Sequence, residues 1–102
     1  MKEDQAMAAF GALSNKTRLA VLRRLVVAGP EGLSAGAVAE AVGASPSRAS
    51  FHLSALAEAG LVETERRSRT IIYRAGFSTL GALVTFLLED CCGGSAEVKR
   101  CC

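Results

Sequence analysis

The sequence predicts one mainly helical domain that carries a small β-hairpin, and three observations support this. At 102 residues the chain has the usual size of a single domain, and half of its residues are apolar. Alanine, leucine and valine supply most of that apolar half, which favours helices over sheets. Apolar residues recur at helical spacing in five segments, whereas Ile71–Tyr73 gathers β-branched and aromatic residues. We therefore expect five helices and a two-stranded hairpin.

The first two predicted helices lie near the N-terminus. One covers Asp4–Leu13, where apolar residues recur every three or four positions. Ser14 or Asn15 then offers a cap to a second helix that runs through Ala28. A segment rich in glycine and proline, 29–32, ends this helix in a turn.

A short turn joins the third and fourth predicted helices. Ser34 caps the third helix and Gly43 ends it. Ser45 is a good N-cap for the fourth helix, and Pro46 suits its first position. This helix runs to about Ala59. Two helices joined in this way match the helix-turn-helix arrangement, in which the second helix enters the major groove of DNA.

A β-hairpin directly follows these helices. Its predicted strands are Leu61–Arg66 and Thr70–Ala75, joined by a loop at 67–69. A hairpin in this position is a wing, so the fold class is a winged helix-turn-helix. A fifth helix is expected to begin at Ser78 or Thr79 and to end near Asp90.

The fourth helix and the wing form the predicted DNA-contacting surface. The formal net charge of +2 is too small to indicate nucleic acid by itself, but the arginines are concentrated in the wing. Small hydroxyl residues allow close approach to DNA, Arg48 suits a guanine edge or a phosphate, and the wing arginines suit the backbone or minor groove. For any isolated arginine the alternative is a solvated surface. The predicted DNA-binding residues are Ser45, Ser47, Arg48, Ser50, His52, Arg66, Arg67 and Arg69.

His52 is the single histidine of the chain. One histidine does not make a histidine-rich metal site, so a structural role or DNA contact is favoured over a metal ligand or a pH switch. The sequence shows no acid–base pair and no nucleophile supported by a histidine. It therefore does not predict an enzyme.

All four cysteines lie at the C-terminal end, as the vicinal pairs Cys91–Cys92 and Cys101–Cys102. The sequence has no stretch of about 18 apolar residues and no signal-peptide pattern, so we expect a cytoplasmic protein with reduced thiols. Vicinal cysteines also pair poorly with each other, because the peptide between them would close a strained ring. Ligand or redox roles therefore fit these cysteines better than structural disulfides.

Three runs of the sequence resemble the ArsR/SmtB family of winged-helix repressors. They are Ala-Leu-Ser-Asn-Lys-Thr-Arg-Leu at 12–19, Ser-Phe-His-Leu-Ser-Ala-Leu at 50–56 and Ala-Gly-Leu-Val at 59–62. The resemblance extends to about Asp90. It implies a homodimer, formed through the first and last helices, that binds operator DNA and represses an operon until an inducer binds. We accordingly expect a DNA-binding and dimerisation domain at 1–90 and a cysteine-rich metalloid-binding tail at 91–102.

The ion sites known in this family match the chain to different degrees. Classical arsenic sensors resemble one another in a Cys-Val-Cys motif at the start of the third helix, where this chain has Ser34 and Gly36. Zinc sensors use aspartate and histidine on the last helix, where this chain has Glu89 and Asp90 but no histidine. Other arsenic-responsive members carry a vicinal cysteine pair directly after the last helix and a further cysteine downstream.

The last of these patterns is similar to the C-terminal end of this chain. It implies a thiolate site for a trivalent metalloid, with no catalytic cofactor. The metalloid would be As(III), as arsenite or methylarsenite, or trivalent antimony, as antimonite. Trivalent arsenic forms pyramidal complexes with three thiolates, so Cys101 or Cys102 would complete the pair. Three alternatives stay open: a regulator of a soft metal such as cadmium, zinc or lead, a thiol-redox regulator, and a cytosolic metalloid-binding protein. The predicted ligands are Cys91, Cys92, Cys101 and Cys102.

Overall fold

The computed structural model describes residues 1–91, which form five α-helices and one three-stranded antiparallel sheet. This is the mainly helical winged helix-turn-helix architecture that the sequence predicts. The helices are α1 (Glu3–Leu13), α2 (Lys16–Ala28), α3 (Ala35–Val42), α4 (Pro46–Glu58) and α5 (Phe77–Thr85). The strands are β1 (Leu33–Ser34), β2 (Val62–Arg67) and β3 (Thr70–Ala75).

Three helices begin at the polar side chains that the sequence offers as caps. The Asn15 side chain accepts hydrogen bonds from two backbone N–H groups at the start of α2, both at 3.0 Å. Ser34 and Ser45 accept one backbone hydrogen bond each at the starts of α3 and α4. Gly43 ends α3 with a φ of +68°, a conformation in which a side chain would be strained. The predicted boundaries around the helix-turn-helix are therefore confirmed.

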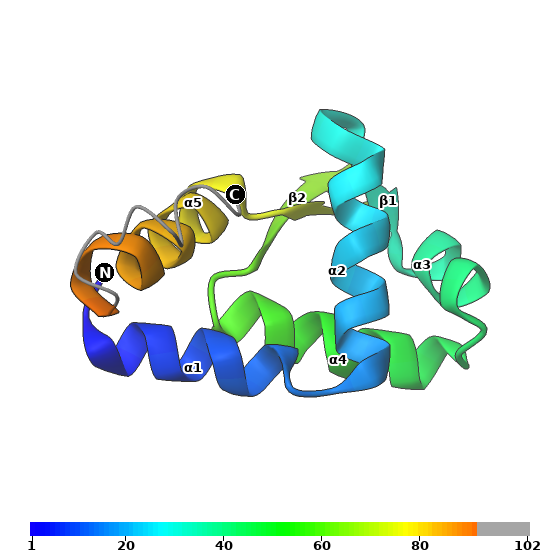
Figure 1. Cartoon of the computed structure of the whole chain (residues 1–102). Helices are drawn as coiled ribbons and strands as arrows, with labels where there is room; N and C mark the ends of the chain where they lie inside the picture. The colour runs from blue at the N-terminus through cyan, green and yellow to red at the C-terminus, as the bar shows by residue number, and fades with distance from the viewer. Residues whose placement is uncertain (92–102) are drawn as a thin grey trace.

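The helices surround a core to which α2 and α4 contribute most. Figure 1 shows α1 and α4 along one side of the molecule, with α2 rising from them toward the sheet. Leu25 of α2, Leu53 and Leu56 of α4, and Leu61 after α4 are fully buried. This packing fixes α4 along one side only, so its other side faces outward.

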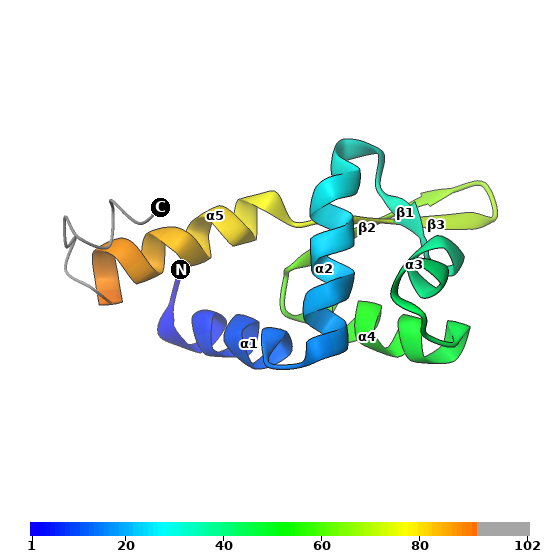
Figure 2. The same ribbon diagram turned by 45° about the vertical axis from the view of Figure 1, so that its right-hand side comes forward.

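The sheet contains one strand that the sequence did not predict. β1 pairs with β3 antiparallel, with Leu33 opposite Tyr73, and β3 also pairs with β2. Two residues are too few to show the alternation by which a strand is recognised in a sequence. Residues 68 and 69 connect β2 to β3, and Ser68 has a φ of +57°. The hairpin projects beyond the helices as a wing (Figure 2).

The last helix begins earlier than predicted. Gly76, and not Ser78 or Thr79, is its N-cap residue, and its N–H donates to the carbonyl of Leu61 at 2.8 Å. A Cβ on Gly76 would lie 2.5 Å from the carbonyl oxygen of Gly60, so the two chain segments approach too closely for a side chain. After Thr85 the helix continues as a π-helical segment, Phe86–Cys91. No helix in residues 1–91 is long and apolar enough to cross a membrane.

Candidate nucleic-acid interface

One side of α4 is exposed and lined mainly by hydroxyl groups. Ser47, Ser50 and Ser54 share this side with Phe51, because residues three and four apart lie on one helical face. Ala49 and Leu53 point the opposite way, into the core. Ser47 and Ser50, two of the predicted DNA contacts, are therefore accessible to a ligand as large as duplex DNA.

The start of α4 carries the positive end of the helix and an exposed arginine. Ser45 accepts the N–H of Arg48 at 3.3 Å, and its hydroxyl lies 3.4 Å from that of Ser47. Both serines and Arg48 are exposed. A helix N-terminus favours negative charge, and a guanidinium binds phosphate or a guanine edge. This end of α4 is thus suited to a nucleic acid.

His52 lies on the inner flank of α4 and is only 7% exposed. Arg18 at the start of α2 donates its Nε–H to Nδ1 of His52 at 3.2 Å, so this nitrogen carries no proton. Burial, together with the positive charges of Arg18 and Arg48, holds the pKa of His52 below its ordinary value. Of the two roles favoured from the sequence, this geometry matches the structural one, because DNA contact would require an exposed ring.

From the sequence, Phe51 stands next in line on the recognition helix but is not among the predicted site residues, and neither is Arg18. The guanidinium carbon of Arg18 lies 5.7 Å from the centre of the Phe51 ring, a cation–π geometry. The Phe51 and His52 rings meet edge to face with their centres 5.6 Å apart. A phenylalanine on an otherwise hydroxyl-lined face was the available signal. Arg18 gave none, because it is 34 residues from His52 in the sequence.

The wing arginines differ in their partners. Arg67 pairs with Glu65 at 3.0 Å, and Arg74 of β3 also bonds to Glu65. These two hydrogen bonds hold the pKa of the Glu65 carboxyl below its ordinary value. Within residues 1–91 the structure shows no ion pair for Arg66 or Arg69. Two of the three predicted wing contacts therefore keep their full positive charge exposed.

A hollow lies where the wing meets α3 and α4. It is lined by Ser34, Gly36, Ser50, Arg69 and Thr70, with three further residues. Ser34 and Gly36 are the positions that correspond to the cysteine motif of classical arsenic sensors. Hydroxyl and guanidinium groups here suit an oxygen anion better than a thiophilic ion.

The predicted thiolate site falls largely outside the described residues. Cys91 is the last residue of the π-helical segment, and Cys92, Cys101 and Cys102 lie beyond the residues that the structure describes. In the described part of the chain no group of three or more histidine, cysteine, aspartate or glutamate residues is arranged to hold a metal ion. The ligand set thus stays a prediction.

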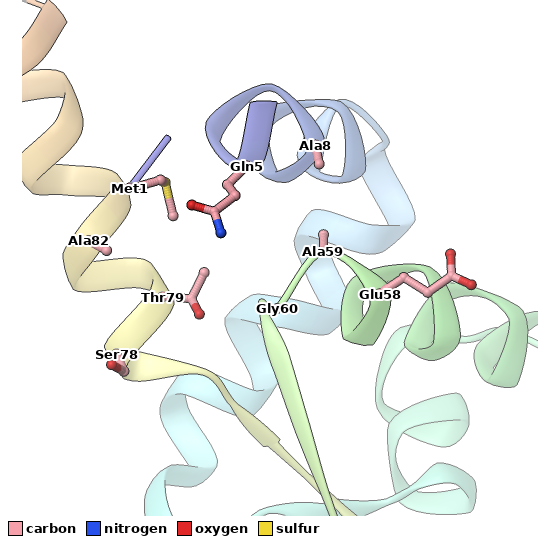
Figure 3. Close-up of a pocket in the computed structure, with 9 residues that line it drawn as sticks. All are labelled: Met1, Gln5, Ala8, Glu58, Ala59, Gly60, Ser78, Thr79 and Ala82. Atoms are coloured by element: carbon pink, nitrogen blue, oxygen red, sulfur yellow. The ribbon is translucent and has the colours of Figure 1, made fainter. Parts of the chain in front are cut away.

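A second hollow lies between α5, α1 and the C-terminal end of α4. Gln5 of α1, Gly60 and Thr79 of α5 are among the residues that line it (Figure 3). A Cβ on Gly60 would lie 3.3 Å from the Thr79 hydroxyl oxygen. The first turn of α5 therefore packs closely on the turn that ends α4.

Comparison with known proteins agrees with this architecture. A family model described as a helix-turn-helix domain matches residues 13–65. The uncharacterized HTH-type transcriptional regulator YceK of Bacillus subtilis (strain 168) is 48% identical over 61 residues. That match covers 60% of this chain and 60% of YceK, which is less than two thirds of the relative. The nodulation protein NolR of Rhizobium meliloti is 40% identical over 94 residues, 86% of this chain and 75% of NolR.

Two solved structures are similar over most of the chain. An ArsR-like transcriptional regulator from Rhodococcus sp. RHA1 has a TM-score of 0.75 and 33% identity, covering 95% of this chain and 85% of that one. The second is the homodimeric winged helix-turn-helix DNA-binding domain of Mb0332 from Mycobacterium bovis, a possible ArsR-family regulator. It has a TM-score of 0.66 and 30% identity, with coverage of 85% and 84%.

Proposed function

Because the chain belongs to the ArsR family of winged helix-turn-helix transcriptional regulators, we propose that it is a metalloid-responsive repressor. It is a regulator and not an enzyme. In this proposal a homodimer binds operator DNA and releases it when a trivalent metalloid binds the C-terminal thiolates. The observation that carries the DNA-binding part is the exposed side of α4, where hydroxyl groups and Arg48 lie near the exposed wing residues Arg66 and Arg69.

The division of labour on the DNA follows from the chemistry of each group. Arg48 and the serines of α4 address base edges in the major groove, which carry the sequence information. Arg66 and Arg69 of the wing contact phosphates or the minor groove and add affinity that depends on salt. Two copies present two such helices to successive major grooves of a partly palindromic operator.

The proposed dimer uses α1 and α5. Met7 of α1 is 65% exposed, and Val84 of α5 and Leu87 of the π-helical segment that follows it are also exposed. Exposed aliphatic groups at helical spacing favour a second apolar surface. Mb0332, the similar Mycobacterium bovis protein, is homodimeric, which supports the same assembly for this chain.

The inducer site is proposed on ligand chemistry. Cys91 ends the π-helical segment after α5 and Cys92 follows it directly in the sequence. In a reducing cytoplasm both thiols are available, and soft thiolates prefer thiophilic ions. Arsenite or antimonite takes three thiolates, so Cys101 or Cys102 is the third ligand. Methylarsenite takes two and needs only the first pair.

The proposed coupling runs from α5 to α4 through the turn between α4 and β2. Gly76 bonds to Leu61, and Thr79 packs on Gly60, so a shift of α5 displaces the C-terminal end of α4. The segment before the cysteines is π-helical, a rare geometry that is frequent at functional sites. Release of DNA requires the metalloid to favour the weak-binding state, typically by about 1–3 kcal/mol.

The test is a titration of a complex between the reduced full-length chain and the DNA upstream of its own gene. We expect arsenite to release the DNA, and Cys91→Ser and Cys92→Ser to bind it normally without releasing it. Arg48→Ala should have the reverse effect of the cysteine variants. We expect its operator affinity to fall about 5- to 150-fold while its arsenite uptake stays intact.

Other outcomes select a different function. Release by cadmium or by a reversible oxidant, with no response to arsenite, methylarsenite or antimonite, would identify a soft-metal or thiol-redox regulator. Arsenite uptake without specific DNA binding would identify a metalloid-binding protein instead.

A further inference from the structure

Phe51 is an apolar ring on a surface that is otherwise suited to polar base edges. It is 63% exposed, and its neighbours along the same face of α4 are Ser47, Ser50 and Ser54. A single exposed aromatic residue is ordinary by itself. This one lies among the exposed serines of the predicted DNA-contacting side of α4.

One side of the Phe51 ring is held by two other side chains. The Arg18 guanidinium lies 5.7 Å from the ring centre, and the edge-to-face contact with His52 is 5.6 Å between centres. The Arg18 side chain is itself held in place, because its Nε–H donates to Nδ1 of His52. The ring is therefore oriented before any ligand arrives, and its open side faces away from the protein.

We propose that Phe51 is a specificity-determining residue that packs on a thymine methyl group in the major groove. The proposal rests on the proposed function, since it requires that α4 reads operator DNA. The C5-methyl of thymine is the apolar group that base edges present in this groove, and phenylalanine is one of the residues that contact it. The serines and Arg48 then take the polar edges beside it.

Arg18 and His52 act as positioning residues in this arrangement. A free phenylalanine side chain loses rotamer entropy when it docks, whereas a ring already held by two contacts loses less. Arg18 reaches the recognition helix from α2, so two separate elements set the orientation of the ring.

The experiment compares thymine and uracil at single positions of one DNA duplex. The probe is the segment upstream of the chain's own gene that the full-length protein protects in a footprint. Uracil lacks only the C5-methyl group. Burial of one methyl corresponds to about fourfold in affinity, so we expect about a fourfold loss at one or more positions in each half-site. Phe51→Ala should bind the thymine duplex more weakly and show no loss at those positions.

Matched variants separate this effect from general damage. Val27 is an exposed apolar residue at the far end of α2, and Val27→Ala should keep the full thymine preference. Phe51→Leu retains an apolar contact and should keep part of it. Phe51→Ala loses the contacts with Arg18 and His52 and should unfold at a slightly lower temperature, but it should stay folded in the binding experiment because the ring is largely exposed.

Equal uracil losses in the unmodified chain and Phe51→Ala would overturn the proposal and leave the repressor function standing. The absence of any uracil effect would do the same. If no footprint forms, the proposed function fails, and this inference fails with it.

Discussion

α4 and α5 each pack one side on the protein core, yet they expose different chemistry on the other side. The exposed side of α4 carries hydroxyl groups, Arg48 and a single aromatic ring. α5 exposes Phe77 and Val84, and the π-helical segment that continues it exposes Leu87. Hydroxyl and guanidinium groups can exchange water for base edges and phosphates, while aliphatic groups gain only from another apolar surface. The proposed DNA-contacting surface therefore needs only one chain, whereas within residues 1–91 the apolar side of α5 is left exposed.

The largest effect is expected from a charge placed on the apolar side of α5, which tests whether this side forms a dimer interface. Val84 is 47% exposed, so Val84→Asp should fold but should no longer associate, because the carboxylate would be buried without a partner. We expect a monomer in sedimentation at micromolar concentration. Operator affinity should fall about 100-fold or more, because the two half-sites are no longer bound by linked recognition helices.

Thr85→Asp supplies the control for that variant. Thr85 is exposed on α5 but lies about 100° around the helix from Val84. It should leave the association unchanged. A Val84→Asp variant that remains dimeric would show that the apolar side of α5 does not form the interface.

The helices also differ in whether their first residues could be predicted from the sequence. Caps act within three residues, so Asn15, Ser34 and Ser45 could be recognised as helix starts without a structure. The start of α5 could not, because Gly76 is placed by its close approach to Gly60, a contact made only in the folded chain. β1 was missed for the same reason, since its pairing with β3 is what makes it a strand.

The candidate site shows the same limit. The serines and Arg48 follow from the position of a recognition helix, and their exposure agrees with that prediction. The contact between Arg18 and His52 joins residues 34 apart and could not be predicted from spacing. Of the two roles favoured for His52 from the sequence, it supports the structural one, because the ring is buried on the inner side of α4.

A smaller effect should follow from protonation of His52, the single histidine of the chain. Its pKa in the folded protein is lowered, mainly by burial and further by Arg18 and Arg48, so the unfolded chain binds this proton more readily. The free energy of unfolding should therefore be highest above about pH 6.5 and should fall as the pH drops below that value toward the lowered pKa. Denaturant unfolding between pH 7.5 and 5.5 measures the effect.

His52→Asn keeps an acceptor near the position of Nδ1 and does not titrate. We expect this variant to retain the bond from Arg18 and to lose the pH dependence in this range. His52→Leu removes the acceptor and should cost about 0.5–1.5 kcal/mol of stability. An unchanged pH dependence in His52→Asn would show that His52 does not cause it.

The smallest expected effect is a difference between the wing arginines in how they change the salt dependence of DNA binding. Each phosphate contact contributes about 3.5-fold to the fall in affinity between 50 and 200 mM salt. Arg66→Ala should remove such a contact and flatten the salt dependence. Arg67→Ala should change it less, because Glu65 already neutralises part of the Arg67 charge. Glu65→Gln should therefore steepen the salt dependence, and this steepening should be smaller in a double variant with Arg67→Ala, where only Arg74 still loses its ion pair with Glu65. Equal effects of Arg66→Ala and Arg67→Ala would mean that DNA displaces Glu65 from Arg67, since both arginines would then reach phosphate.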